Sequence, residues 1–295
     1  MEINQLLKKG VDLIKDREYS NPVLEATLLL AELLNVDKIY IYTHGRDKVI
    51  EPIVDKFLEL MKKRASGYPF QYLINKKEFM GLDFYIEEGV LIPRSDTEIL
   101  VEYVLEYIDN KYKDKPVNIL DLGIGSGAIA LSIAYYKRNA IVYGVDIYDT
   151  PLKVSRINKE RFKLSNINLF KGDLFQGICG LNRKFHIITS NPPYIPKKDI
   201  TTLQKEVKDH EPKEALDGGE DGLKFYKRII HESKNYLMKN GLLIFEIGYD
   251  QGKQVANMMM NENFKNVQIL QDLQGLDRVV LGINGKGVGI DNDFN

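Results

Sequence analysis

From residue 117 onward, short apolar segments alternate with helical ones, and this alternation restricts the possible folds more than any other feature of the chain. Strands separated by helices pair in parallel, and helices then cover both faces of the sheet. No helix separates the last two strand candidates, so we expect these two to pair antiparallel. The sequence therefore predicts an α/β domain with a seven-stranded, mostly parallel sheet. Its strand candidates are residues 117–121, 140–146, 166–173, 185–190, 242–247, 266–271 and 278–283.

The first part of the chain has a different character. Residues 1–66 show helical periodicity and no strand pattern, so they are predicted to form a helical domain. Within it, Ser20-Asn21-Pro22 combines a capping residue with an early proline, which is typical of a helix start, and Asn35 is a plausible helix end.

Residues 67–94 connect this helical part to the sheet domain, and their alternating pattern predicts a β-hairpin linker that turns near Gly81. Ser95 and Glu98 have capping-box spacing at the start of the next helix. We expect the sheet domain to span residues 95–283. Residues 284–295 are rich in Gly, Asn and Asp and predict a flexible tail.

The composition excludes several classes of protein. Lys and Arg number 41 against 42 Asp and Glu, and this balance argues against broad binding to a phosphate backbone. The single cysteine allows no internal disulfide, and the four histidines are far apart in sequence, so we expect no metal site. No apolar run is long enough for a membrane span or a signal peptide. We therefore expect a cytoplasmic protein.

A glycine-rich turn, DLGIGSGAIA, follows the first strand of the sheet domain and precedes a helix. Glycines let a backbone turn sharply and approach a ligand, and a helix N-terminus offers free N–H groups. The spacing G-x-G-x-G differs from the G-x-G-x-x-G of dinucleotide-binding proteins. It resembles the first motif of class I methyltransferases, which have a Rossmann-like fold and bind S-adenosylmethionine.

Acidic residues at the next two strand ends strengthen this interpretation. Asp146 ends the second strand, where a carboxylate can accept hydrogen bonds from ribose hydroxyls, and Asp173 with Leu174 follows the third. The alternatives are a purely structural glycine turn, with Asp146 as a helix cap and Leu174 and Phe175 as core residues. The predicted cofactor-binding residues are Gly123, Ile124, Gly125, Ser126, Gly127, Asp146, Asp173, Leu174 and Asn191.

The most specific motif is Asn191-Pro192-Pro193-Tyr194, directly after the fourth strand. An amide or nucleobase nitrogen is a poor nucleophile, so an enzyme that methylates it must orient it and support the charge that develops on it. The Asn191 side-chain oxygen and the Pro192 carbonyl can accept the two N–H groups, and Tyr194 offers an aromatic face. We expect Asn191, Pro192 and Tyr194 to be catalytic, and all four residues to bind substrate. The alternative is a rigid turn.

The order of motifs from about residue 66 to 282 resembles the release factor glutamine methyltransferase family, which also has a helical N-terminal domain. The segments that carry the resemblance are YPFQYLINKKEFMGLDFYIEEGVLIPR, DLGIGSGAIALSIA, SNPPYIP, EPKEALDGGEDGL and DLQGLDRVVLG. The resemblance implies methylation of N5 of the glutamine in the Gly-Gly-Gln loop of class I peptide-chain release factors, with S-adenosylmethionine as cofactor. It also implies that residues 1–66 recognise the substrate and that no nucleic acid or membrane is bound.

The sequence departs from the family pattern in two places. Ser95 stands where many relatives have proline, and Leu174 stands where some have an aromatic residue, which weakens a stacking role there. Arg94, in the linker, is expected to form a local ion pair rather than a substrate contact. Three other functions stay open: glutamine methylation of a ribosomal protein, adenine methylation of DNA, and a non-catalytic cofactor-binding scaffold.

Overall fold

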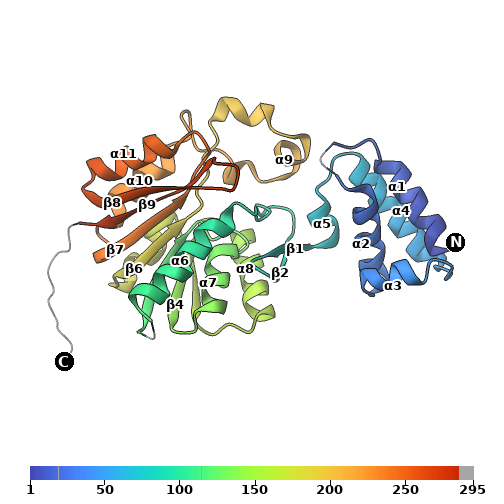
Figure 1. Cartoon of the computed structure of the whole chain (residues 1–295), viewed down its shortest axis with the longest axis horizontal. Helices are drawn as coiled ribbons and strands as arrows, with labels where there is room; N and C mark the ends of the chain where they lie inside the picture. Colours follow the sequence, from blue (N-terminus) through green and yellow to red (C-terminus); the bar gives the residue numbers. More distant parts are fainter. Residues whose placement is uncertain (19, 114, 286–295) are drawn as a thin grey trace. The chain divides into compact units, whose positions relative to one another are not determined.

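The computed structural model of the protein describes residues 1–18, 20–113 and 115–285 (Figure 1). The chain divides into two compact units. Residues 1–76 and 204–210 form the helical unit, and residues 77–203 together with those from 211 onward form the sheet unit. Most of the predicted tail, residues 286–295, lies outside the described residues, whereas Asn284 still belongs to the last strand.

The helical unit forms around apolar residues that its helices share. Helix α2 begins where the sequence predicts, because the Asn21 side chain accepts the Leu24 N–H at 3.1 Å and Pro22 occupies the first turn. It ends at Asn35, which is left-handed with φ 53°. Leu6, Leu30 and Phe57 are fully buried between the helices. The helices are α1 (Ile3–Ile14), α2 (Pro22–Leu34), α3 (Lys38–Thr43), α4 (Glu51–Ala65), α5 (Phe70–Ile74) and α9 (Lys205–His210).

The helical unit extends past residue 66, where the sequence analysis places its end. The chain continues from α4 into the short helix α5, whose Phe70 is buried in the core of this unit. The hairpin predicted to turn near Gly81 is present as β1 (Lys76–Phe79) and β2 (Leu82–Tyr85). The segment 67–94 is therefore not one linker. Its first part completes the helical unit, and its hairpin leads into the sheet unit.

A buried ion network holds α9 in the helical unit although α9 lies far along the chain. Arg64, on α4, has a side chain that is 3% exposed, and it donates to Glu25 at 2.7 Å and to Glu206 at 2.6 Å. Arg17 lies 3.5 Å from the same Glu206 carboxylate. Two carboxylates around one buried guanidinium compensate its charge, so the loss of either partner leaves a charge unpaired.

The sheet unit contains the predicted seven-stranded sheet, in the order β5-β4-β3-β6-β7-β9-β8. The first five strands in this order are parallel. β9 is antiparallel to β8, as predicted, and it also inserts between β8 and β7. The strands are β3 (Val117–Leu122), β4 (Ala140–Asp146), β5 (Ile167–Lys171), β6 (Phe185–Ser190), β7 (Leu237–Glu246), β8 (Phe264–Gln271) and β9 (Asp277–Asn284).

Helices cover both faces of this sheet (Figure 1). On one face, α6 (Thr97–Lys111) packs on α7 (Ala128–Tyr136), which in turn contacts α8 (Asp149–Arg161). The other face carries the 3-10 helix η1 (Leu174–Leu181), α10 (Lys224–Ser233) and α11 (Gly252–Asn261), which share a core with Leu120, Leu122 and Phe245 of the strands. None of the helices in the described part of the chain is long and apolar enough to cross a membrane.

The predicted capping box at Ser95 is wrong. Helix α6 begins one residue after Asp96, and no side chain caps it. Glu98 instead accepts the Met80 N–H at 2.6 Å, so this carboxylate fastens the hairpin to α6. The hairpin is also held by Asn158 of α8, whose side-chain oxygen accepts the Tyr85 N–H at 2.7 Å. Both contacts are non-local and cannot be inferred from local spacing.

The ion network of the helical unit can be tested with Arg64→Met. We expect this change to lower the stability of the helical unit by about 3–5 kcal/mol, because it leaves the buried Glu25 carboxylate without its cation and Glu206 with only the more distant Arg17. Hydrogen exchange of full-length protein should show the loss in peptides from α4 and α9. The matched control is Lys56→Met, which breaks the exposed Lys56–Glu59 pair and should change stability by less than about 1 kcal/mol. Equal protection in both variants would contradict the assigned role.

Candidate active site

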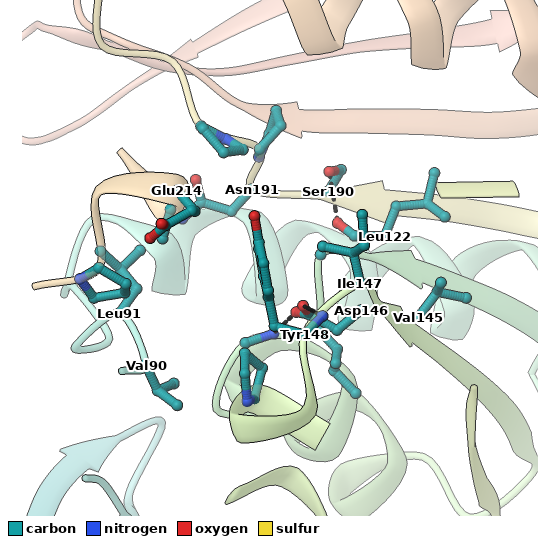
Figure 2. Close-up of a pocket in the computed structure, with 18 of the residues that line it drawn as sticks. Val90, Leu91, Leu122, Val145, Asp146, Ile147, Tyr148, Ser190, Asn191 and Glu214 are labelled. Carbon is teal, nitrogen blue, oxygen red and sulfur yellow. Dashed lines mark hydrogen bonds between the residues drawn. The ribbon is translucent and has the colours of Figure 1, made fainter. Parts of the chain in front are cut away.

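A cavity of about 530 Å³ lies at the carboxyl ends of the parallel strands, within the sheet unit (Figure 2). Leu122 of β3, Val145 of β4 and Ser190 of β6 line its base. The Ser190 hydroxyl donates to the Leu122 carbonyl at 2.7 Å, which ties two of these strand ends together. A cavity of this size and position suits a small-molecule ligand.

The glycine turn forms one wall of the cavity. Gly123 has φ +76° and Gly125 has φ +57°, a conformation that favours glycine. A Cβ atom on Gly123 would meet nothing within 4 Å, so the backbone here borders open space. Gly127 differs, because it does not line the cavity and a Cβ there would lie 2.4 Å from Leu131. Of the predicted cofactor residues, Gly127 alone is absent from the cavity wall, and it serves the start of α7.

Asp146 lies directly beside the glycine turn. Its Oδ2 accepts the Gly125 N–H at 3.0 Å and its Oδ1 accepts the Tyr148 N–H at 3.1 Å (Figure 2). Burial raises the pKa of Asp146, although the backbone hydrogen bonds oppose this shift. Each carboxylate oxygen can accept a further bond, so these structural contacts leave acceptor capacity on the cavity side. The structural and the ligand-binding interpretations of Asp146 are therefore compatible.

Asp173 and Leu174 also line the cavity, whereas Phe175 does not. The Asp173 Oδ2 atom accepts from Arg228 of α10 at 2.8 Å, so part of its hydrogen-bonding capacity serves an ion pair. Phe175 is buried in the core, where its ring stacks on Tyr236 with 4.5 Å between ring centroids. Phe175 is therefore a core residue, and Leu174 is the one of the two that can pack against a ligand in the cavity.

The loop after β6 brings three of its four motif residues to the cavity. Asn191, Pro192 and Pro193 line the same cavity as the glycine turn. Tyr194 does not line the cavity, and its ring packs partly buried against the core. Burial raises the pKa of its hydroxyl, and its backbone carbonyl accepts from Gln251 at 2.9 Å. The expected substrate contact of Tyr194 is therefore not visible in this arrangement.

Comparisons with known proteins agree with this geometry. Residues 5–74 match the family model "PrmC N-terminal domain", and residues 96–219 match "Methyltransferase small domain". The release factor glutamine methyltransferase of Clostridium acetobutylicum is 40% identical over 97% of this chain and 99% of its own length. That of Clostridium botulinum is 40% identical over 95% of this chain and 98% of its own.

The chain belongs to the release factor glutamine methyltransferase family. The fold agrees as well, since a crystal structure of a methyltransferase from Pyrococcus furiosus superposes with a TM-score of 0.51. That structure is 17% identical, and the match covers 70% of this chain and 91% of the other. The predicted class I methyltransferase fold with an N-terminal helical part is thus confirmed.

In this family member, several cavity residues lie outside the sequence motifs. Ile147 and Tyr148 follow Asp146, and the Tyr148 ring projects into the space bordered by Asn191 and Glu214 (Figure 2). Arg228 and Phe225 reach the cavity from α10. The sequence could have identified Ile147 and Tyr148 as cavity residues, because they directly follow Asp146 at the end of a strand. Glu214, Phe225 and Arg228 arrive from distant segments and have no local signal.

Arg94 makes the ion pair that the sequence analysis favoured. It donates to Glu211, whose side chain is 2% exposed, and the other Glu211 oxygen accepts the Ile92 N–H at 3.3 Å. Glu211 lies within the polar connection that follows the Asn-Pro-Pro-Tyr motif, residues 195–221, so this pair joins that connection to the segment between the hairpin and α6. Arg94 also lines the cavity, so its side chain can reach a ligand there.

Beneath the glycine turn, Asp121 is fully buried and accepts the Thr189 hydroxyl at 2.7 Å. Burial is the main cause that raises the pKa of Asp121 to about 7, against 3.8 for an aspartate exposed to water. Because the folded pKa lies above the unfolded one, the unfolded state loses this proton first as pH rises. The contribution of Asp121 to stability is therefore fully present below pH 4 and is lost between about pH 4 and 7.

We expect Asp121→Asn to remove this pH dependence, because asparagine keeps an acceptor for Thr189 and cannot ionise. Relative to wild type, the free energy of unfolding of the variant should rise between pH 5 and 7, by at most about 3 kcal/mol. Urea unfolding at a series of pH values measures this difference. A constant difference across that range would show that Asp121 is already ionised in the folded protein at low pH.

Proposed function

We propose that this protein transfers the methyl group of S-adenosylmethionine to N5 of the glutamine in the Gly-Gly-Gln motif of class I peptide-chain release factors, and so modulates translation termination. S-adenosylhomocysteine is the second product. The observation that carries the proposal is the meeting of the glycine turn and the Asn191-Pro192-Pro193 loop in one cavity. Full-length similarity to release factor glutamine methyltransferases supports the choice of acceptor.

The cavity fits the proposed cofactor. At Gly123 a Cβ would project into open space, so the bare backbone leaves room for a ligand against the turn. Asp146 retains acceptor capacity for ribose hydroxyls, and Leu174 and Ile147 give the wall an apolar surface. These residues, with Gly125, Ser126 and Asp173, would hold S-adenosylmethionine. When bound, the cofactor supplies a methyl group on a sulfonium, which is a strong electrophile.

The protein's own residues then have to position a weak nucleophile. The Asn191 side-chain oxygen and the Pro192 carbonyl accept the two N–H groups of the glutamine amide, which fixes the plane of the amide and supports positive charge on nitrogen as the new bond forms. Pro192 and Pro193 have no N–H donor and restrict the loop. The amide nitrogen held by these acceptors would take up the methyl group and would then release its extra proton to solvent.

Tyr194 is proposed to hold the substrate loop in place. Contact of its ring with the substrate would require a rearrangement on binding. Its ring packs on the core, and its carbonyl is held by Gln251, so it secures the end of the motif. The helical unit is proposed to recognise the release factor, and neither nucleic acid nor a membrane is needed as a partner. Because release factors work on ribosomes, we propose that the protein acts in the cytoplasm.

The acceptor is tested by incubating a class I release factor with the protein and labelled S-adenosylmethionine. We expect a mass increase of one methyl group, about 14 Da, on a single glutamine, and none when that glutamine is replaced. Asn191→Ala should lower the turnover rate by roughly 10²–10³-fold, as loss of one preorganised polar partner does in other enzymes. The matched control is Asn261→Ala, at the exposed end of α11, which should behave as wild type.

The same assay separates the alternatives. Methyl transfer to a glutamine of a ribosomal protein, with none to release factors, would reassign the substrate. Transfer to adenine in DNA would reject amide methylation altogether. Full cellular function of Asn191→Ala would favour a non-catalytic scaffold.

Cofactor binding is tested separately by calorimetry with S-adenosylmethionine. We expect Asp146→Ala to weaken binding by at least roughly tenfold, because a charged acceptor for the ribose hydroxyls is lost. Asp109→Ala, which removes an exposed carboxylate on α6, is the control and should leave the dissociation constant unchanged. Unaltered affinity of Asp146→Ala would remove Asp146 from the proposed cofactor site.

A further inference from the structure

One acidic residue lies next to the motif loop and is not used by the mechanism above. Glu246 is the last residue of β7, and its side chain is buried, with the residue 3% exposed. In the parallel pairing of β6 with β7, Ser190 is opposite Phe245. The next residues along these strands are Asn191 and Glu246, so the two leave the sheet side by side. Glu246 does not line the cavity, whereas Asn191 does, so the glutamate is placed behind the asparagine.

The surroundings of Glu246 connect it to the Asn191 amide. Thr97 and Asn191 favour the ionised form of the Glu246 carboxylate and so lower its pKa. The Asn191 Nδ2 atom also lies 3.5 Å from the Thr97 hydroxyl oxygen. The Glu246 Oε2 atom is buried and has no hydrogen-bond partner within the described part of the chain. The nitrogen end of the Asn191 amide therefore faces Thr97 and Glu246, which leaves its oxygen end for the cavity.

This orientation matters because an asparagine amide can present either end. The proposed reaction needs the oxygen end in the cavity, where it can accept an N–H of the substrate. An ionised carboxylate only accepts hydrogen bonds, so it pairs with the Asn191 NH₂ group and repels the Asn191 oxygen. A neutral residue in its place could accommodate both orientations.

We propose that Glu246 is a positioning residue that fixes the Asn191 amide with its oxygen toward the cavity. This inference rests on the proposed function, since it assigns a cause to the orientation that amide methylation needs. Glu246 acts only through Asn191 and does not contact the substrate.

The ionisation state of Glu246 gives the inference a pH signature. Burial, with a smaller contribution from the neighbouring Asp96, raises the pKa of Glu246 to about 7 against the opposing effects of Thr97, Asn191 and Arg278 of β9. The Tyr194 and Tyr226 hydroxyls are the other titratable groups that interact with it, and burial raises the pKa of both above the ordinary tyrosine value. Protonated Glu246 can donate as well as accept, and it then no longer selects one amide orientation. We therefore expect wild-type turnover to rise as pH increases through about 7.

The test measures single-turnover methylation of a release factor, with saturating S-adenosylmethionine, between pH 5.5 and 8.5. Glu246→Gln should lower the rate at pH 8 by roughly tenfold, leave cofactor affinity unchanged and flatten the pH profile, because glutamine presents a donor and an acceptor at every pH. Glu246→Asp keeps a carboxylate and should keep a rate that rises with pH. Glu102→Gln, on the exposed side of α6, is the matched control and should follow wild type.

Two results would overturn the positioning role. One is a wild-type profile in Glu246→Gln. The other is an equal loss at all pH values in Glu246→Gln and Glu246→Asp, which would indicate a structural role alone. If the glutamine variant does not fold, the profile of the folded aspartate variant decides, and a flat one rejects the inference. Absence of any transfer by wild type is a different failure, because it rejects the proposed substrate and leaves the orientation of Asn191 to be tested with another acceptor.

Discussion

The backbone register of the parallel strands determines which residues can act together in this protein. β3 pairs with β4 on one side and β6 on the other, and β6 pairs with β7. All four strands end at the same edge, so the glycine turn, Asp146, Asn191 and Glu246 meet there although more than 120 residues separate the first from the last. A shift of one residue in any pair would point the terminal side chains to the opposite face. The positions of the site residues are therefore fixed by the hydrogen-bonded register of these strands.

Three buried acidic residues lie at or near that edge, and each has a different role because its surroundings differ. Asp121 is fully enclosed and bonded by Thr189, so it supports the turn from below. Asp146 is bound by the N–H groups of Gly125 and Tyr148, which fix the carboxylate while leaving lone pairs toward the cavity. Glu246 faces the amide of Asn191. Burial raises the pKa of all three, but only Asp146 lines the cavity, so only that carboxylate is placed to meet a ligand directly.

Much of the fold could be predicted from the sequence because its signals are local. The Asn21-Pro22 helix start, the hairpin at Gly81 and the glycine turn each depend on residues a few positions apart. The site residues that the sequence analysis missed depend on pairing across strands or on contacts between distant segments. Glu246 can be assigned a role only because strand pairing places it beside Asn191, and Arg228 only because it pairs with Asp173. Glu98 shows the reverse error, since its spacing from Ser95 predicted a capping box, whereas the helix is preceded by Asp96 and the Glu98 carboxylate bonds the hairpin instead. Local spacing identifies candidate groups, and tertiary pairing decides which partner each takes.

The connection from Ile195 to Asp221 links the site to the helical unit. Its two ends are joined within the sheet unit, where the Ile195 N–H donates to Leu216 at 3.0 Å and the Gly218 N–H donates to Ile195 at 2.9 Å. Its middle, α9, belongs to the helical unit, held there by Arg64. The segment that directly follows the substrate loop thus leaves one unit, is anchored in the other and returns. If the helical unit recognises the release factor, the substrate loop is connected to it in the chain by this segment as well as by the hairpin. The protein's own residues contribute the orientation of the amide nitrogen, so the loop that orients it stands in the chain next to the segment that belongs to the helical unit.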